Sequence, residues 1–300
     1  MNYYINLMAH AYSGSTLLAF LLGSHSDIAT VGELGGKTNY NNYSCSCGQL
    51  LNECQFWNDV QNAMVSKGYD LQLDQFNIRP NDGVSYSSLD FFYNRYFPFK
   101  MIDDCRDKLF LTKKRRYWQN QIIQKNVALA ETICEVQNKN IFFDSTKDFY
   151  RLRYLKDYFG GNLKILRLCR NGKAIVHSMN QKKNYSIKSA IKEWIYVENY
   201  IERIIRNYVD DKNIMYVYLE ELCNQPIDTL NDIFEFLSIN KISSIDNSTF
   251  SNQHLIGNVM RKNFDGTIRL NEEWKSQIST ENINIFNKYA KNLNEYLGYD

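Results

Sequence analysis

Short apolar runs alternate along this chain with longer stretches in which apolar positions recur at helical spacing. The apolar runs cover residues 3–9, 28–31, 140–144, 163–169 and 214–218, and they have the length and continuity of strands buried on both faces. The stretches between them have the pattern of amphipathic helices. This alternation predicts an α/β fold in which helices flank an open, mostly parallel sheet. On such a sheet, ligands bind at the carboxyl ends of the strands.

The rest of the chain is predicted to be mainly helical. The longest amphipathic pattern covers residues 187–207, and Pro226 stands at the start of another helix, where its missing N–H costs nothing. Residues 58–136 have a mostly helical pattern with irregular connections. Neither an internal repeat nor a linker-like tract is visible. We therefore expect one domain, residues 1–300, with residues 58–136 as a largely helical insertion.

The charge balance narrows the class of partner. The chain has 35 Lys and Arg against 33 Asp and Glu, a net charge of +2, which argues against a dedicated nucleic-acid binder. Hydrophobic residues make up 44% and charged residues 23%, which is ordinary for a globular protein. Residues 1–9 lack the features of a signal peptide, and the apolar run 17–22 is too short to cross a bilayer. We expect a soluble, cytoplasmic protein without a transmembrane segment and of unassigned oligomeric state.

A polar, glycine-containing loop joins the first strand to the first helix. Such a loop directs successive backbone N–H groups and the positive end of the helix dipole toward one point, which suits a phosphate or a sulfate. Ser15 stands where the Walker A loop of nucleotide-binding proteins requires Lys, so this is not that motif. The same pattern also occurs in ordinary turns in which Ser or Thr caps a helix. The candidate binding residues are Tyr12, Ser13, Gly14, Ser15, Thr16 and Leu17.

A second polar motif follows the strand at residues 163–169. Arg170 leaves the carboxyl end of that strand, and Ser178 lies two turns into the next helix. An Arg and a hydroxyl form a suitable clamp for a terminal phosphate, because the guanidinium can donate two parallel hydrogen bonds. The alternative is an Arg that only caps or solvates the helix.

Together, these two motifs resemble the 5′-phosphosulfate loop and the 3′-phosphate motif of sulfotransferases that use 3′-phosphoadenosine 5′-phosphosulfate (PAPS). Residues 170–179 are especially similar to the R-D-G-R-A-x-V-H-S-M stretch of tyrosylprotein sulfotransferases. The resemblance runs from Ser13 to Tyr299, apart from residues 58–136, and it rests on the joint order of the motifs. Further matching segments are residues 24–28, 32–34, 144–147, 218–226, 257–261 and 297–299.

The resemblance implies a P-loop nucleotide-kinase-like fold and in-line transfer of a sulfuryl group from PAPS to a hydroxyl or an amine. The product nucleotide would be 3′-phosphoadenosine 5′-phosphate (PAP), and the reaction would need no metal ion. Glu33 matches the catalytic Glu of the tyrosylprotein enzymes and is the expected general base. Lys147 lies in a segment where those enzymes also use a Lys, and it would offset charge on the leaving phosphate. The resemblance also assigns Tyr218 and Arg261 to the cofactor site. Lys262, next to Arg261, is expected to help complete the 3′-phosphate site.

Tyr12 departs from the family, in which Lys or Arg commonly precedes the S-G-[ST]-T run. A phenol can donate a hydrogen bond but brings no positive charge at neutral pH. This departure keeps a second interpretation open, a non-catalytic module that binds PAP or PAPS. A P-loop nucleotide kinase is a further alternative, although its Lys is missing. His10, His177 and His254 are rival candidates for the base.

The sequence leaves the acceptor open. Residues 58–136 match no motif and are expected to shape the acceptor pocket. A sugar, a lipid, a small phenol or alcohol, and a peptide tyrosine all stay open as acceptors.

Three of the cysteines, Cys45, Cys47 and Cys54, lie close together in the sequence. They supply three soft ligands, one short of a closed zinc site. A disulfide is unusual in the cytosol. The sequence therefore favours a thiol-rich structural loop without a metal.

Overall fold

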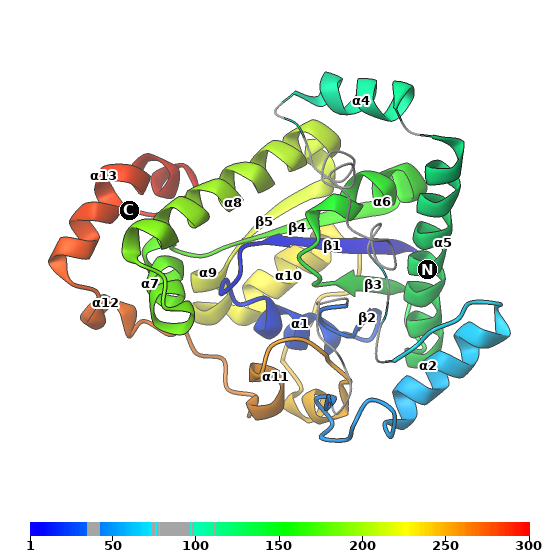
Figure 1. Cartoon of the computed structure of the whole chain (residues 1–300). Coiled ribbons are helices and arrows are strands. Elements are labelled where there is room, and N and C mark those ends of the chain that lie inside the picture. Colours follow the sequence, from blue (N-terminus) through cyan, green and yellow to red (C-terminus); the bar gives the residue numbers. More distant parts are fainter. Residues whose placement is uncertain (35–42, 74–75, 77, 79–96, 98, 111) are drawn as a thin grey trace.

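The centre of the molecule is a five-stranded sheet in which every strand pair is parallel (Figure 1). The computed structural model describes all residues except 35–42, 74–75, 77, 79–96, 98 and 111. Because most strand residues are apolar, the sheet can be covered on both faces, and the predicted α/β architecture is confirmed. The order across the sheet is β2 (Ile28–Thr30), β3 (Ile141–Asp144), β1 (Tyr3–Ala9), β4 (Leu163–Cys169) and β5 (Ile214–Tyr218).

Two hydrophobic cores lie on opposite faces of the sheet. Ile5 and Leu7 of β1 pack with the buried residues of α1 (Ser15–Gly23) and α10 (Pro226–Phe236). Tyr4 and Met8 of the same strand pack on the other side, with residues of α5 (Lys113–Gln137), α6 (Leu152–Phe159) and α8 (Ile187–Tyr208). In Figure 1, α8 crosses above the sheet and α1 lies below it. The main helices are α1 (Ser15–Gly23), α2 (Gln55–Ser66), α4 (Lys100–Leu109), α5 (Lys113–Gln137), α6 (Leu152–Phe159), α7 (Gly172–Lys183), α8 (Ile187–Tyr208), α9 (Leu219–Asn224), α10 (Pro226–Phe236), α11 (Met260–Asn263), α12 (Trp274–Gln277) and α13 (Thr280–Tyr296).

The described part of residues 58–136 is largely helical, as the sequence predicts. It contains most of α2 together with α4 and nearly all of α5. Helix α5 contacts β2 and β3, and α2 packs on α5 at the edge of the molecule (Figure 1). This region therefore covers the β2 edge of the sheet. No helix of the described chain is both long enough and apolar enough to cross a bilayer.

A buried ion pair and a buried hydrogen bond fix the carboxyl end of β3. Asp144, the last residue of that strand, pairs with Arg151 and accepts a hydrogen bond from the Tyr4 hydroxyl. All three side chains are fully buried. Removing one partner of such a pair leaves an uncompensated charge, which costs about 3–5 kcal/mol. The chain that follows Asp144 therefore leaves the sheet from a firmly held position.

Candidate functional site

The loop after β1 leads into α1 through two residues in the left-handed region. Tyr12 has φ = 67° and Gly14 has φ = 89°. A Cβ added at Gly14 would lie 2.4 Å from the Leu219 Cδ1 atom, so the loop fits closely against α9. The hydroxyl of Ser13 is used inside the loop, where it donates to the His10 carbonyl at 2.6 Å. Among the described residues, no side chain caps the N-terminus of α1, and the first backbone N–H groups of a helix have no intrahelical partner.

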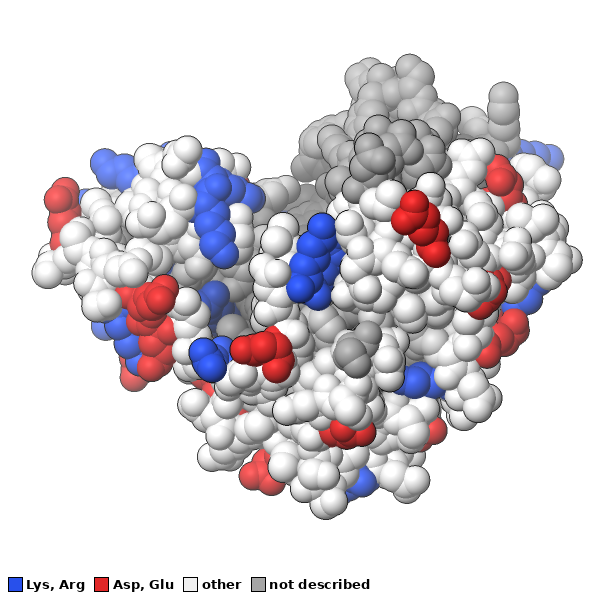
Figure 2. Space-filling view, turned by 90° about the horizontal axis from the view of Figure 1, so that it is seen from below, with Lys and Arg blue, Asp and Glu red and all other residues white. Residues whose placement is uncertain are grey.

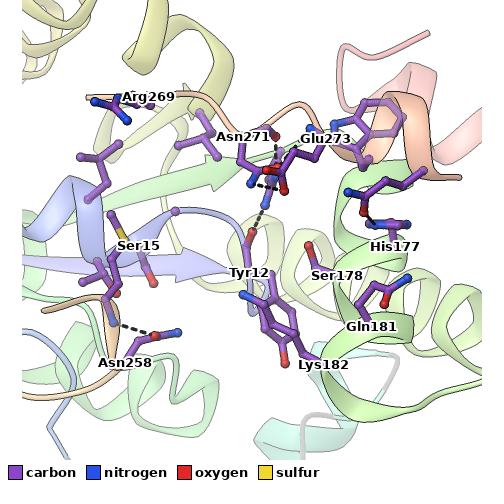
Figure 3. A pocket seen from close by; sticks show the side chains of 18 residues that line it. Tyr12, Ser15, His177, Ser178, Gln181, Lys182, Asn258, Arg269, Asn271 and Glu273 are labelled. Atoms are coloured by element: carbon purple, nitrogen blue, oxygen red, sulfur yellow. Dashed lines mark hydrogen bonds between the residues drawn. The ribbon is translucent and has the colours of Figure 1, made fainter. Parts of the chain in front are cut away.

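This loop forms one side of a cavity of about 480 Å³ (Figure 3). The opposite side comes from α7 and from the segment that leads into α12. Of the residues expected in the cofactor site, seven line the cavity: Tyr12, Gly14, Ser15, Thr16, Leu17, Arg170 and Ser178. The structure therefore brings the two sequence motifs together across one cavity at the carboxyl ends of β1 and β4.

Arg170 connects three parts of the cavity. One terminal nitrogen donates to the Tyr12 carbonyl at 2.8 Å, and the other donates to the Asn271 carbonyl at 3.1 Å. Its Nε atom is buried and has no hydrogen-bond partner among the described residues. Burial lowers the pKa of Arg170 from its usual value, but an Arg side chain stays charged in proteins. Ser178, on α7, donates to the Ala174 carbonyl at 2.9 Å, which leaves its oxygen lone pairs for a further donor.

Other cations surround the same cavity. Lys182 of α7 and Arg269, which precedes α12, also line it. The Lys182 ammonium lies 5.4 Å from the centre of the Tyr12 ring, and that of Lys183 lies 5.9 Å from it. Two ammonium groups thus approach the phenol at the position where the sequence lacks a basic residue. Figure 2 shows that the molecule is hollowed beside the part that carries α12 and α13, with Lys and Arg side chains on both sides of the hollow.

Glu33 and Lys147 meet at the edge of this loop. The Lys147 ammonium donates to the Ser15 hydroxyl at 3.0 Å and forms an ion pair with the Glu33 carboxylate. The backbone of Glu33 is fixed by its N–H, which donates to the Ile256 carbonyl at 3.0 Å. Neither charged side chain lines the cavity itself. Lys147, however, contacts Ser15, which lines the cavity, and Glu33 is connected to Ser15 through Lys147.

Besides Ser13, three expected cofactor residues do not line the cavity. Tyr218 lies at the end of β5, where its ring packs edge-on against Tyr299 at 5.9 Å. The buried Arg261 guanidinium donates to the carbonyls of Gly257, Asn258 and Ser44. Lys262 is exposed. None of these three residues lines the cavity as described, and their part in cofactor binding stays a prediction.

The three histidines that are rival candidates for the general base lie in different places relative to the cavity. His177 lines the cavity, and its Nε2 atom lies 3.1 Å from the Gln277 side-chain oxygen. His10 is buried beneath the loop, and His254 lies beside the cysteines Cys45 and Cys54. Only one of the three histidines therefore faces the cavity.

Several lining residues have no signal in the sequence. They belong to segments that follow β5 and contain little regular structure, so neither periodicity nor a motif marks them. Because they are far in sequence from the loop after β1, sequence patterns do not predict that they lie close to it. They include Arg269, Asn271, Glu273 and Trp274. Asn258 and Met260 also line the cavity, but they lie in the matching segment 257–261.

Comparison with solved structures identifies the fold of this chain. No family model and no curated protein matches the sequence. Among solved structures, the sulfotransferase domain from the curacin biosynthetic pathway aligns with a TM-score of 0.53 at 14% identity, covering 100% of this chain and 99% of that one. The sulfotransferase domain of the Synechococcus PCC 7002 olefin synthase aligns with a TM-score of 0.45 at 16% identity, covering 99% and 94%. The chain thus has the fold of a sulfotransferase domain.

Proposed function

We propose, from this sulfotransferase fold and the cavity beside the loop after β1, that the chain transfers a sulfuryl group from PAPS to a hydroxyl or an amine. The observation that carries the proposal is the convergence of that loop, Arg170 and Ser178 on one cavity, with Lys147 in contact with Ser15. A sequence motif alone does not require these groups to meet. Their meeting supports a ligand with phosphate groups at two separate positions.

The chemistry of the cavity suits an adenosine bisphosphate. Cationic side chains at Arg170, Lys182 and Arg269 complement several negative charges. The buried Arg170 Nε without a partner is a donor that a phosphate oxygen can satisfy. Trp274 offers an aromatic face on which a base can stack. In this proposal the loop residues hold the 5′-phosphosulfate, and Arg170 with Ser178 holds the 3′-phosphate.

The reaction forms a bond between sulfur and the acceptor oxygen or nitrogen while the bond from sulfur to the 5′-phosphate oxygen breaks. Negative charge grows on that leaving phosphate oxygen, near the Ser15 side of the loop. Lys147 is the cation in contact with Ser15, and it would stabilise this charge. Glu33 would accept the acceptor's proton. Once Glu33 is neutral, its ion pair with Lys147 is lost, so the ammonium is released to follow the leaving group. The mechanism proposed here uses no metal ion.

The acceptor stays unassigned among sugars, lipids, small phenols or alcohols and peptide tyrosines. A non-catalytic module that binds PAP or PAPS is the alternative that Tyr12 suggests. Lys147 favours the enzyme, because it places a cation beside the loop where Tyr12 brings none.

Calorimetric titration with PAP, in buffer without Mg²⁺, tests the cofactor class, with ATP and Mg²⁺ as the comparison. We expect one PAP to bind per chain, and to bind more tightly than the ATP–Mg²⁺ complex. Absence of PAP binding, or a preference for ATP with Mg²⁺, would refute the proposal. Release of PAP from PAPS across a panel of acceptors then separates the enzyme from the module, because only the enzyme turns over.

A further inference from the structure

Three cysteines and a histidine come together outside the lining of the cavity. Cys45 and Cys47 belong to the hairpin at residues 43–51, Cys54 directly precedes α2, and His254 comes from the segment before α11. The sulfur and nitrogen atoms that could bind a metal all lie within 4.8 Å of one another. The sequence offers three of these ligands in one stretch, and the fold adds the fourth from two hundred residues away.

Three of the separations between these atoms are close to those of a tetrahedral site. The Cys54 sulfur lies 3.3 Å and the Cys45 sulfur 3.7 Å from the His254 Nδ1 atom, and the sulfurs of Cys47 and Cys54 are 3.7 Å apart. Zinc bonds of about 2.3 Å to sulfur and about 2.0 Å to nitrogen, at tetrahedral angles, place two sulfurs about 3.8 Å apart and a sulfur about 3.6 Å from a nitrogen. We propose that Cys45, Cys47, Cys54 and His254 bind one Zn²⁺ ion.

The ligand set favours zinc in a structural role. Thiolate is a soft ligand and imidazole a borderline one, and four such ligands in a tetrahedron are typical of a closed zinc site. None of the four residues lines the cavity at the loop after β1. The cysteines are free thiols, and the 3.7 Å between the Cys47 and Cys54 sulfurs is far longer than the roughly 2.0 Å of a disulfide. A zinc ion at this site would thus take no direct part in the proposed transfer reaction.

The surrounding contacts hold His254 in place for a metal. Ser46, between two of the cysteines, accepts a hydrogen bond from the Leu255 N–H at 2.7 Å and donates to the Gln253 carbonyl. Hydrogen bonds from the hairpin therefore hold both sequence neighbours of His254 in place. The Phe56 ring stacks on the imidazole, with ring centres 4.6 Å apart and an angle of 6° between the ring planes. Such outer contacts orient a metal-binding histidine.

The metal would connect this hairpin to the segment that fixes Glu33. Two residues after His254, the Ile256 carbonyl accepts the Glu33 N–H, and Gly32 forms a bridge with Ile256. Arg261, five residues after Ile256, donates to the Ser44 carbonyl of the hairpin at 2.7 Å. This bond also connects the hairpin to the segment that contains His254. A zinc ion here would hold together three segments that few regular backbone contacts join. Its loss would loosen the backbone beside Glu33.

The test begins with the wild-type chain, purified under reducing conditions after growth with zinc. Elemental analysis should find about one zinc per folded chain, and exchange for Co²⁺ should give the thiolate charge-transfer and tetrahedral d–d bands of cobalt bound by sulfur. A folded chain that contains no zinc and binds no Co²⁺ would overturn the proposal. So would mass spectrometry that finds two of these three cysteines in a disulfide.

Variants then identify the ligands. Cys47→Ser and His254→Ala should lower the zinc content from about one equivalent to below a tenth and should remove or shift the cobalt bands. Cys105→Ser and Cys223→Ser are the matched controls, because these free cysteines lie outside the cluster, and they should keep the full metal content. Equal zinc content in ligand and control variants would contradict the assignment. If a ligand variant fails to fold, the cobalt spectrum of the wild type still decides. Neither outcome depends on PAP binding or on sulfuryl transfer.

Discussion

The ammonium of Lys147 lies 3.0 Å from the hydroxyl of Ser15. These residues come from different strand ends: Ser15 begins α1 after β1, and Lys147 follows β3. Strands β1 and β3 are parallel neighbours, so their carboxyl ends lie at the same edge of the sheet. The contact supplies the loop after β1 with a cation from the next strand. The same ammonium pairs with Glu33, which follows β2.

Replacing Lys147 by Met should lower turnover much more than PAP binding. The ammonium is proposed to act on charge that develops only as the sulfur–oxygen bond breaks, and removing one such group typically costs on the order of 10²- to 10³-fold in rate. Steady-state kinetics with an acceptor that supports turnover, combined with PAP calorimetry, would separate the two effects. Lys241→Met is the control, since Lys241 is exposed and pairs with Glu235, and neither residue lines the cavity. Turnover unchanged in Lys147→Met would remove this residue from the mechanism.

Arg170→Ala should weaken PAP binding by about 10- to 100-fold, the usual loss for hydrogen bonds between charged groups. The loss should be smaller for adenosine 5′-monophosphate, which lacks the 3′-phosphate. Ser178→Ala should also weaken PAP binding more than binding of adenosine 5′-monophosphate. Both losses should be smaller than in Arg170→Ala, because the substitution removes one neutral hydroxyl. Calorimetry with the two nucleotides measures both losses. Equal losses for both nucleotides in Ser178→Ala would show that this pair does not hold the 3′-phosphate.

The sheet was predictable because its strands are buried on both faces. Such strands are continuous apolar runs, and the predicted run at residues 163–169 has the bounds of β4, Leu163–Cys169. The amphipathic pattern predicted at 187–207 ends one residue before the end of α8, Ile187–Tyr208. Local patterns of this kind depend on burial alone. They do not give the order in which strands pair, with β1 between β3 and β4.

The site was only partly predictable, and the reason is sequence separation. The loop after β1 and Arg170 follow strands, so their common edge could be expected from the fold class. Arg269 and Trp274 follow irregular chain, and only tertiary packing brings them to the cavity. His254 approaches Cys54 in the same way. Neither residue type nor spacing marks a histidine that lies two hundred residues from its partners.

Gly14→Ala should destabilise the loop and weaken PAP binding. Its φ of 89° disfavours any residue with a Cβ, and that atom would lie 2.4 Å from the Leu219 side chain. Gly68→Ala is a matched control, since Gly68 has φ = 83° with nothing within 4 Å. The control should cost only the backbone term of about 1–2 kcal/mol and should keep PAP affinity. Urea unfolding and calorimetry measure both. Equal effects of the two substitutions on PAP binding would mean that the fit against Leu219 is unimportant.

His10 should make the protein less stable in mild acid. Burial lowers the pKa of His10 below its usual value of 6.5. The Nδ1 atom donates to the Ala11 carbonyl at 2.8 Å, and Nε2 is buried without a hydrogen-bond partner in the described chain. A proton added to Nε2 would therefore be a buried donor with nothing to bind. Since the unfolded histidine takes up that proton freely, the unfolded state binds more protons than the folded one as the pH falls through 6.5.

The free energy of unfolding of the wild type should therefore fall as the pH is lowered below 6.5, by at most about 1.4 kcal/mol per pH unit from this residue. His10→Gln keeps a polar side chain of similar length but cannot take up the proton. Urea unfolding at several pH values should show a shallower loss of stability in the variant, with matching slopes for the two proteins above pH 7.5 or so. Identical slopes at low pH would mean that His10 is protonated as easily in the folded chain as in the unfolded one. The buried Nε2 atom would then have a partner once it is charged.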